Sequence, residues 1–223
     1  MGQMIELKTK DGQVISAYRA KPADKPRGGL VVIQEIWGVN SHIRNVADGY
    51  GADGYLVIAP AIFDRIERGV IMDEYTPDTM QKGFGYMQKV NIEHVLLDVG
   101  AAVEAASGAG KVGVVGFCFG GRVAWLAASR VKGLAASVPY YGGGIPALAS
   151  ERPKCPVMLH FGERDQHIPV ASVEDFKKAQ PTLPVYIYAA DHGFNCDQRE
   201  SYDASAAKLA RERTLKFLRE HVG

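Results

Sequence analysis

One cysteine of this chain lies in a setting typical of an enzymatic nucleophile. Cys118 is the centre of the run G-F-C-F-G-G at 116–121, with an apolar strand candidate before it and a helical stretch after it. This pattern is the G-x-S-x-G nucleophile elbow with cysteine in place of serine. The elbow is a strained turn, so its flanking positions must be glycine for strand and helix to approach closely. A free cysteine can instead be a small buried hydrophobe, but that role needs no flanking glycines.

The elbow also indicates how developing negative charge would be stabilised. The backbone N–H of Phe119 comes at the start of the helix, where it can donate to an oxyanion. Upstream, Glu35 and Ile36 directly follow the run G-L-V-V-I-Q, a strand candidate for the centre of a sheet. The N–H of Ile36 falls where α/β-hydrolases place their second oxyanion donor, and Glu35 is expected near the nucleophile. The alternative for Glu35 is a solvated residue at a strand end.

An acid and a base follow Cys118 in the chain order that α/β-hydrolases use. Asp165 lies on the loop after the apolar run V-M-L-H-F-G, and His192 lies on the loop after V-Y-I-Y-A-A. Sites of α/β proteins assemble at the C-terminal ends of parallel strands, so we expect the two loops to meet near Cys118. Glu163 is the main rival for the acid. His167 is a rival base, although it would place acid and base on one loop.

The remaining histidines and cysteines fall outside this pattern. His160 is expected to be a hydrogen-bonded core residue, because it lies inside an apolar strand. Surface, packing or incidental roles are expected for the others: His42, His94, His221, Cys155 and Cys196. No H-E-x-x-H motif or other metal spacing occurs, so we expect neither a metal nor another cofactor.

The elements that would position these groups alternate between β-rich runs and segments of helical period. Such alternation predicts an α/β sheet with helices on both faces. Strands are expected at Met4–Lys8, Val14–Arg19, Gly29–Gln34, Tyr55–Ala59, Val112–Gly116, Leu134–Pro139, Val157–Gly162 and Val185–Ala189. The dipeptide at 11–12, D-G, predicts a hairpin between the first two.

Helices are expected after the cap residues Asn40 and Asn91 and over about 202–222. The segment 64–87 carries three glycines and one proline and is expected to be an irregular loop. A loop of that length is often a lid or a binding wall. A surface excursion without function is the alternative.

Composition limits the class of protein. The chain has 223 residues, 47% of them hydrophobic and 23% charged, which predicts a single soluble domain over 1–223. Lys plus Arg number 26 and Asp plus Glu 25, a balance that argues against a nucleic-acid or membrane-surface partner. No apolar run approaches the ~20 residues of a membrane span, and the first residues lack the apolar core of a signal peptide. We therefore expect a cytoplasmic protein, as a monomer or small homo-oligomer.

Five motifs together resemble the dienelactone hydrolase (carboxymethylenebutenolidase) family, cysteine members of the α/β-hydrolase superfamily. They are Q-E-I-W-G-V-N-S-H-I-R at 34–44, G-Y-L-V-I-A-P at 54–60, G-F-C-F-G-G at 116–121, G-E-R-D-Q-H-I-P at 162–169 and D-H-G-F at 191–194. The resemblance covers essentially the whole chain. It implies a three-layer α/β-hydrolase fold, with helices on both faces of a mostly parallel eight-stranded sheet.

The resemblance also implies a role for each candidate residue. Cys118 would be the nucleophile, His192 its base and Asp165 the orienting acid. Glu35 would be the carboxylate that contacts the resting thiol, and Ile36 and Phe119 would give the oxyanion amides. One departure concerns the arginines that hold a substrate carboxylate in the family's best-known enzymes. One of them follows the histidine by four residues, which here is Cys196, so the nearest arginine, Arg199, becomes the candidate substrate-binding residue. A second arginine, expected at 64–90, has no clear match.

These expectations converge on hydrolysis of a small lactone or ester of the dienelactone type, through a Cys-His-Asp triad and a thioester acyl-enzyme. A broader carboxylesterase of the same fold is the first alternative. A non-catalytic ligand-binding protein and a redox-sensing thiol protein, with Cys196 as the resolving cysteine, are the others.

Overall fold

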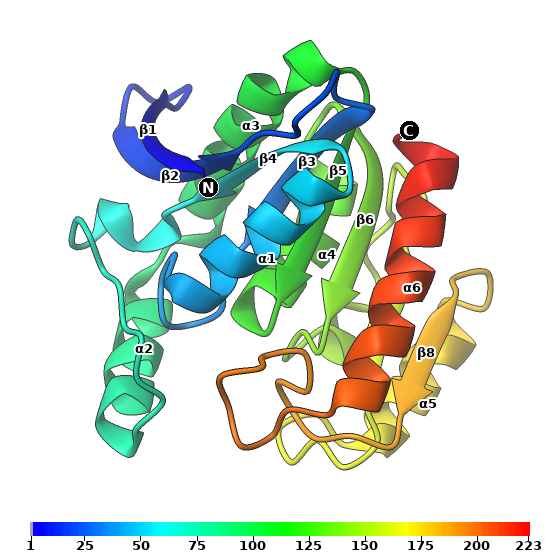
Figure 1. Ribbon diagram of the computed structural model, residues 1–223. Coiled ribbons are helices and arrows are strands. Elements are labelled where there is room, and N and C mark those ends of the chain that lie inside the picture. Colours follow the sequence, from blue (N-terminus) through cyan, green and yellow to red (C-terminus); the bar gives the residue numbers. More distant parts are fainter. Residues whose placement is uncertain (1) are drawn as a thin grey trace.

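The computed structural model, described for residues 2–223, is built around one twisted eight-stranded sheet (Figure 1). Its strand order is β1-β2-β4-β3-β5-β6-β7-β8. β2 runs antiparallel to both β1 and β4, and all other neighbours are parallel. The strands are β1 (Gln3–Lys8), β2 (Val14–Ala20), β3 (Gly28–Ile33), β4 (Tyr55–Pro60), β5 (Val112–Phe117), β6 (Leu134–Tyr140), β7 (Leu159–Gly162) and β8 (Val185–Tyr188). The expected mostly parallel sheet is confirmed. The first and last residues of each predicted strand lie within two positions of those of the observed strand.

The burial of the strands explains their sequence patterns. Every residue of β3 and β5 is buried, because these central strands are covered on both faces and therefore read as continuous apolar runs. The edge strand β1 is mostly exposed and pairs with β2 through the predicted hairpin. Gly12 supplies the positive φ of that turn, at 86°.

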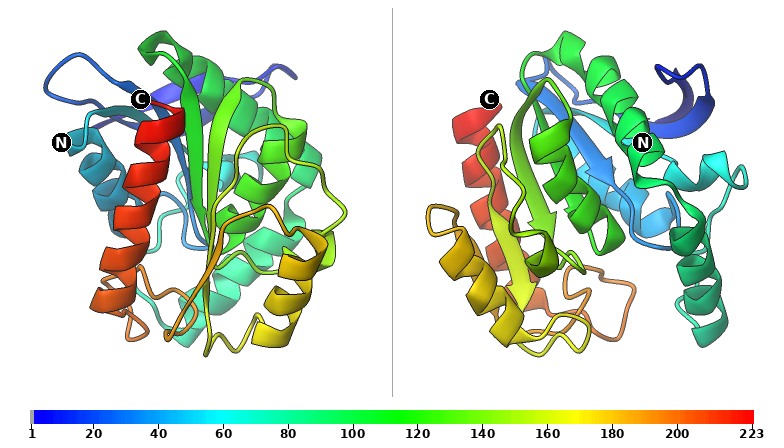
Figure 2. Two further views of the ribbon diagram at one scale, coloured as in Figure 1. Left: turned by 90° about the vertical axis from the view of Figure 1, so that its right-hand side faces the viewer. Right: turned by 180° about the vertical axis from the view of Figure 1, so that it is seen from behind.

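Residues 2–223 form six α-helices and three short 3₁₀ turns, and all the α-helices except α2 cover the two faces of the sheet (Figure 2). α1 and α6 lie on one face, and α3, α4 and α5 on the other. The helices are α1 (Ser41–Ala52), α2 (Pro77–Lys89), α3 (Ile92–Ala106), α4 (Phe119–Arg130), α5 (Val170–Ala179) and α6 (Ala204–His221), and the turns are η1 (Ile62–Arg65), η2 (Ser107–Ala109) and η3 (Pro146–Leu148). Among residues 2–223, no helix is both long and apolar enough to cross a membrane.

The two predicted helix caps are observed, and a third cap was not predicted. The side chains of Asn40 and Asn91 accept hydrogen bonds from the first-turn N–H groups of α1 and α3, as expected. Asp203 caps α6 in the same way, so that helix begins at Ala204 rather than near 202. α5 has no counterpart among the predicted helices.

The prediction of an irregular loop over 64–87 is wrong for its second half. Residues Pro77–Lys89 form α2, which Thr76 begins through a capping box with Thr79. The helix buries only Gly83 and Tyr86, so its sequence lacks the broad apolar stripe that marks a core helix. Two glycines on the helix lower its intrinsic propensity further.

His160 is a core residue, as expected. It is fully buried in β7, with Nδ1 2.8 Å from the Tyr188 hydroxyl and Nε2 3.1 Å from Thr214 Oγ1. Burial, helped by the positive charge of Arg213, lowers the pKa of His160 from 6.5 to about 3. The ring therefore stays neutral in the folded protein at pH values where the unfolded chain protonates it.

The linkage predicts how stability changes in acid. The pKa of His160 is lower in the folded protein than in the unfolded chain. The contribution of neutral His160 to the free energy of unfolding is therefore present above pH 6.5 and is lost as the pH falls toward 3. Urea denaturation of His160→Gln should show a free energy of unfolding that falls between pH 7 and 4.5 by about 2–3 kcal/mol less than in wild type. His94→Gln, at an exposed position of α3, should keep the wild-type dependence. Equal slopes for His160→Gln and wild type would contradict this account.

Candidate active site

The turn between β5 and α4 holds Cys118 in a conformation that side chains rarely adopt. Its φ is 54° and its ψ −116°. A Cβ on Gly116 would lie 2.0 Å from the carbonyl oxygen of Gly120, and a Cβ on Gly120 would lie 2.4 Å from that of Ile33. Side chains are thus excluded at both positions by backbone atoms, which is the steric reason given for the elbow glycines.

The structure brings Cys118, His192 and Asp165 into one chain of contacts. Cys118 Sγ lies 3.2 Å from His192 Nε2, and His192 Nδ1 lies 2.7 Å from Asp165 Oδ2. The other oxygen of Asp165 accepts the backbone N–H groups of His167 and Ile168, at 2.8 and 3.1 Å. The Asp165 side chain is fully buried and that of His192 is 11% exposed. The carboxylate is therefore satisfied on both sides and oriented on the imidazole.

The two rivals lie outside this chain of contacts. Glu163 is exposed, and Asp165 occupies the position beside the imidazole that a rival acid would need. The His167 ring is also exposed and packs edge-to-face on His192, with ring centroids 5.0 Å apart. The geometry therefore favours Asp165 and His192 over both alternatives.

The protonation of His192 depends on its two partners. Burial lowers the pKa of this imidazole, but the charge of a Cys118 thiolate and the hydrogen-bonded Asp165 carboxylate outweigh burial and raise it to about 10. When the Cys118 sulfur is ionised, the His192 imidazole beside it is therefore protonated at neutral pH.

Glu35 is buried near this centre without touching the thiol. The residue is 2% exposed, so the alternative of a solvated strand-end glutamate is wrong. Within residues 2–223 its carboxylate makes no hydrogen bond to Cys118, and Oε1 lies 3.9 Å from Nη1 of Arg199. The expected contact with a resting thiol is therefore absent from this arrangement, and Arg199 is the neighbouring charge.

A cavity of about 240 Å³ opens over the thiol. Apolar side chains form most of its wall, and a few polar groups converge on one side. Its lining residues are Ile36, Trp37, Met80, Phe84, Met87, Cys118, Phe119, Arg122, Gly143, Gly144, His167, His192 and Arg199. Ile36 and Phe119 are both in this lining, and the N–H of Phe119 has no acceptor within α4 because it belongs to the first residue of that helix. The helix α2, from the segment expected to be a loop, forms one wall of the cavity.

Two arginines line the cavity, and only Arg199 was expected from the sequence. Arg199 is mostly buried, with its guanidinium 4.9 Å from the centre of the Trp37 ring. Arg122 is exposed and makes no ion pair within the described part of the chain. Arg122 lies in the first turn of α4, four residues after Cys118, so its side chain starts from the same end of the helix as the thiol. That spacing was the signal in the sequence that could have identified it.

Two residues for which surface, packing or incidental roles were expected also lie next to Glu35. His42 in α1 and Cys196 in the loop after β8 are both buried. A ring nitrogen of His42 and the sulfur of Cys196 lie within 4.8 Å of a Glu35 carboxylate oxygen and of each other. Spacing along the chain could not indicate this cluster, because its members come from three separate segments.

The fold and the elbow together define the class of protein. A mostly parallel sheet with a nucleophile elbow at the C-terminal end of a central strand is the α/β-hydrolase fold. The model of the dienelactone hydrolase family matches residues 15–222. This chain belongs to the dienelactone hydrolase family, as its motifs indicate.

Similar proteins agree with this assignment. The carboxymethylenebutenolidase of Pseudomonas putida is 33% identical over 224 residues, which cover 96% of this chain and 94% of that protein. A candidate carboxymethylenebutenolidase from Synechocystis sp. is 36% identical, with 93% of this chain and 92% of that protein covered. The crystal structure of a candidate dienelactone hydrolase from Klebsiella pneumoniae superposes with a TM-score of 0.86 at 30% identity, covering 99% of this chain and all of that one. The expected family is confirmed, and with it the enzyme class, a hydrolase.

The contact between α2 and the loop after β3 can be tested with two glycines of the same helix. A Cβ on Gly83 would lie 2.5 Å from the carbonyl oxygen of Ile36, whereas a Cβ on Gly85 would meet no atom of residues 2–223 within 4 Å. Gly85→Ala should raise the free energy of unfolding by up to about 1 kcal/mol through helix propensity. Gly83→Ala should lower it by about 1–3 kcal/mol through overpacking and should speed proteolytic cleavage within 77–89.

Urea denaturation and limited proteolysis measure both effects. If the two alanine variants behaved alike, the close contact of α2 with Ile36 would not be what holds this wall in place.

Proposed function

We propose that this protein hydrolyses a lactone or ester through a thioester formed on Cys118, with His192 as the base and Asp165 as the orienting acid. The observation that carries the proposal is the continuous set of contacts from Sγ to Nε2 and from Nδ1 to Oδ2, at 3.2 and 2.7 Å. A nucleophile, a base and an orienting group in hydrogen-bond reach are the geometric requirement for nucleophilic catalysis.

The steps follow from where each group lies. The Cys118 thiolate attacks the carbonyl carbon, and the oxyanion that forms accepts the N–H groups of Ile36 and Phe119. When the carbon–oxygen bond to the leaving group breaks, the protonated His192 gives its proton to the departing alkoxide. A water molecule then attacks the thioester, His192 takes the proton of that water, and the carboxylic acid leaves with the thiolate restored.

The thiolate must be formed before attack. A free thiol with a pKa of ~8.5 is only slightly ionised at neutral pH. His192 accepts the proton and the N-terminus of α4 favours the anion, whereas the nearby negative charge of Glu35 opposes it. In the proposed cycle Glu35 keeps the thiol protonated until substrate arrives, which protects it from oxidation when the cavity is empty.

The substrate class follows from the cavity wall and its charges. The apolar side chains of α2 fit the hydrocarbon part of a small ester or lactone. Arg122 and Arg199 offer positive charge on the same cavity, which suits a substrate that carries a carboxylate. Together with the name of the Pseudomonas putida relative, a carboxymethylenebutenolidase, this favours an anionic lactone of the dienelactone type. Preference for a neutral ester would instead indicate the broader carboxylesterase.

Replacement of the nucleophile tests the proposal as a whole. Cys118→Ala should lower the hydrolysis rate of both a dienelactone and a small aryl ester by at least about three orders of magnitude. The free energy of unfolding should change by less than about 1 kcal/mol, because the side chain is small. Cys155→Ala, which removes a thiol from outside the cavity, should keep the wild-type rate. Hydrolysis by Cys118→Ala at the wild-type rate would refute the assignment.

The role of Glu35 can be measured on the resting enzyme. Removing its charge with Glu35→Gln should raise the thiolate fraction of Cys118, so iodoacetamide should alkylate this thiol several times faster at pH 7. The acid limb of the pH–rate profile, which reports the coupled Cys118–His192 pair, should move to lower pH. Glu163→Gln removes an exposed carboxylate from the same edge of the sheet and should alkylate at the wild-type rate. An unchanged or slower rate in Glu35→Gln would contradict the gating role.

The two arginines predict a dependence on substrate charge. Arg199→Ala should raise KM for a carboxylated lactone by one to two decades, about 1.4–2.7 kcal/mol, and leave a neutral aryl ester almost unchanged. Arg122→Ala should act in the same direction but more weakly, since its exposed charge is screened by solvent. Arg164→Ala removes an exposed arginine that does not line the cavity and serves as the control. Equal effects of Arg199→Ala on both substrates would show that this residue does not anchor the anion.

A further inference from the structure

Beside the proposed catalytic groups, three ligand-type side chains meet in the protein interior. Glu35 comes from the loop after β3, His42 from the first turn of α1, and Cys196 from the loop after β8. Their exposed fractions are 2%, 2% and 0%. A carboxylate oxygen, a ring nitrogen and the thiol sulfur all lie within 4.8 Å of one another. The proposed hydrolysis uses only the first of these residues.

Two atoms of this cluster lack the partners that buried polar atoms normally have. Nε2 of His42 and Oε1 of Glu35 are both shielded from solvent and make no hydrogen bond within residues 2–223. Buried polar groups without partners are rare and costly. A carboxylate oxygen can only accept, and Nη1 of Arg199, also without a hydrogen bond among these residues, lies 3.9 Å from Oε1, too far to donate to it. Each of the two atoms therefore lacks a partner that a donor or a cation could supply.

The contact made by the other ring nitrogen of His42, Nδ1, indicates whether Nε2 lacks a donor or a cation. Nδ1 lies 3.2 Å from Oδ1 of Asp197, a carboxylate that accepts the Nδ1–H hydrogen. The tautomer with hydrogen on Nδ1 leaves the buried Nε2 with a lone pair that has no partner among these residues, and a ring nitrogen of His42 lies within 4.8 Å of the ligand atoms of Glu35 and Cys196. Metal-ligating histidines in proteins show this arrangement: one ring nitrogen donates its hydrogen to a carboxylate, and the other keeps its lone pair for the metal.

We propose that Glu35, His42 and Cys196 form a binding site for Zn²⁺. Thiolate, imidazole and carboxylate are the ligands that zinc takes in proteins, and a water molecule would complete a tetrahedral set. On binding, the Cys196 S–H bond breaks, its proton goes to solvent and the sulfur bonds the metal, with no change of oxidation state. Ligand atoms around a tetrahedral zinc are about 3.3–3.8 Å apart, so the three side chains must close by about an ångström.

The neighbouring groups set the conditions for binding. The Cys196 thiol lies 3.4 Å from the Tyr75 hydroxyl. Ligation of zinc by a cysteine releases the thiol proton, so the affinity should rise with pH. Arg199 carries a positive charge 3.9 Å from Glu35, which opposes the metal and limits that affinity.

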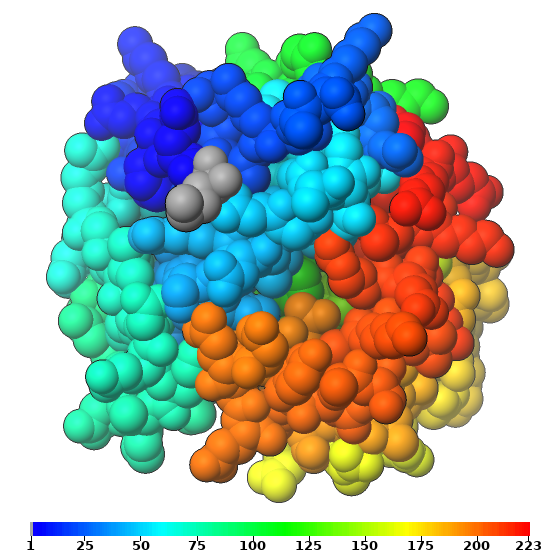
Figure 3. All heavy atoms as spheres, in the orientation of Figure 1, coloured from blue at the N-terminus to red at the C-terminus, as the bar shows by residue number. Residues whose placement is uncertain are grey.

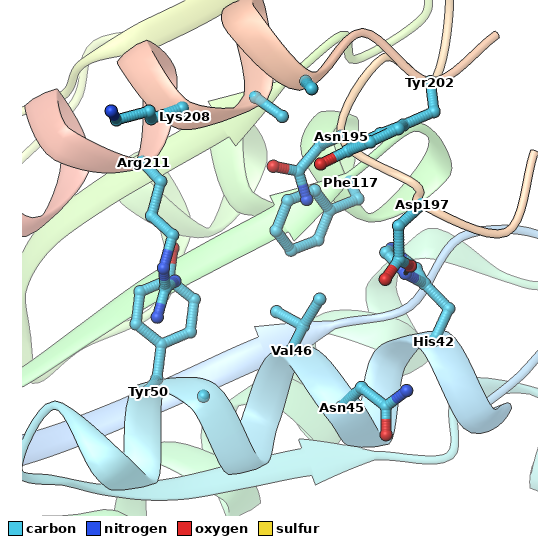
Figure 4. A pocket seen from close by; sticks show the side chains of 13 residues that line it. His42, Asn45, Val46, Tyr50, Phe117, Asn195, Asp197, Tyr202, Lys208 and Arg211 are labelled. Atoms are coloured by element: carbon cyan, nitrogen blue, oxygen red, sulfur yellow. Dashed lines mark hydrogen bonds and ion pairs between the residues drawn. The ribbon is translucent and has the colours of Figure 1, made fainter.

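A route from solvent to His42 is present. A separate cavity of about 410 Å³ lies between α1, α6 and the segment 195–203, and His42 and Asp197 both line it. Figure 3 shows a hollow between these three segments. In the close view, His42 and Asp197 lie side by side at its edge (Figure 4).

Cobalt(II) as a spectroscopic substitute for zinc tests the proposal without reference to activity. Chelator-treated protein titrated with Co²⁺ should bind one equivalent, with a near-ultraviolet thiolate-to-cobalt band and visible bands of tetrahedral cobalt, and Zn²⁺ should displace it. Cys196→Ser should lose the thiolate band. Cys155→Ser, which removes a different thiol, should keep it.

Two further variants make the result decisive. Asp197→Asn changes an exposed carboxylate and leaves the ligands intact, so it should fold normally and bind cobalt about 10–100-fold more weakly. Cys118→Ser should leave the spectrum unchanged. Loss of the thiolate band in Cys118→Ser would place the metal on the proposed nucleophile and overturn the inference. Absence of a thiolate band in wild type would overturn it as well and leave a water molecule as the occupant of the cluster.

Discussion

The backbone contacts around the elbow are the constraint on which the rest of this site depends. A Cβ on Gly116 would lie 2.0 Å from the carbonyl oxygen of Gly120, and one on Gly121 would lie 2.4 Å from that of Tyr140. These oxygens belong to the buried first turn of α4 and to the end of β6, where the backbone cannot move aside, so only glycines let α4 begin immediately after β5. The strained φ of Cys118 is maintained by this packing, and functional sites commonly store strain in this way. The thiol and the first N–H of α4 therefore have fixed positions at one edge of the sheet.

The two buried carboxylates at that edge, Asp165 and Glu35, have different surroundings. Asp165 accepts two backbone N–H groups and the imidazole of His192, which leaves its carboxylate satisfied and immobile. Glu35 is equally buried but has only Arg199, at 3.9 Å, as a neighbouring opposite charge. A carboxylate held this loosely can change partners at small cost, whereas a fully hydrogen-bonded one cannot. The first arrangement suits orientation of a base, and the second suits a group whose position responds to what enters the site.

The helix α2 shows how a weakly packed element can still shape the cavity. It rests on the loop after β3 through Gly83 and presents Met80, Phe84 and Met87 to the space above the thiol. Because so little of the helix is buried, its sequence carries capping signals but no strong apolar period. Regions with few buried contacts are the ones that open most easily, so this wall is the part of the site best able to accommodate substrates of different shape.

Local sequence determined the strands, the elbow and the order of Cys118, Asp165 and His192, because each of these signals is contained within a few neighbouring residues. Apolar runs, glycine spacing and strand-end polar residues report burial and turn geometry directly. Tertiary packing decided what no local pattern contains. It placed Glu35 against Arg199 rather than the thiol, and it gathered His42 and Cys196 around that carboxylate. Such contacts join segments far apart in the chain. They exist only because the parallel strands β3 and β8 end on the same side of the sheet, where the loop after β8 reaches the start of α1.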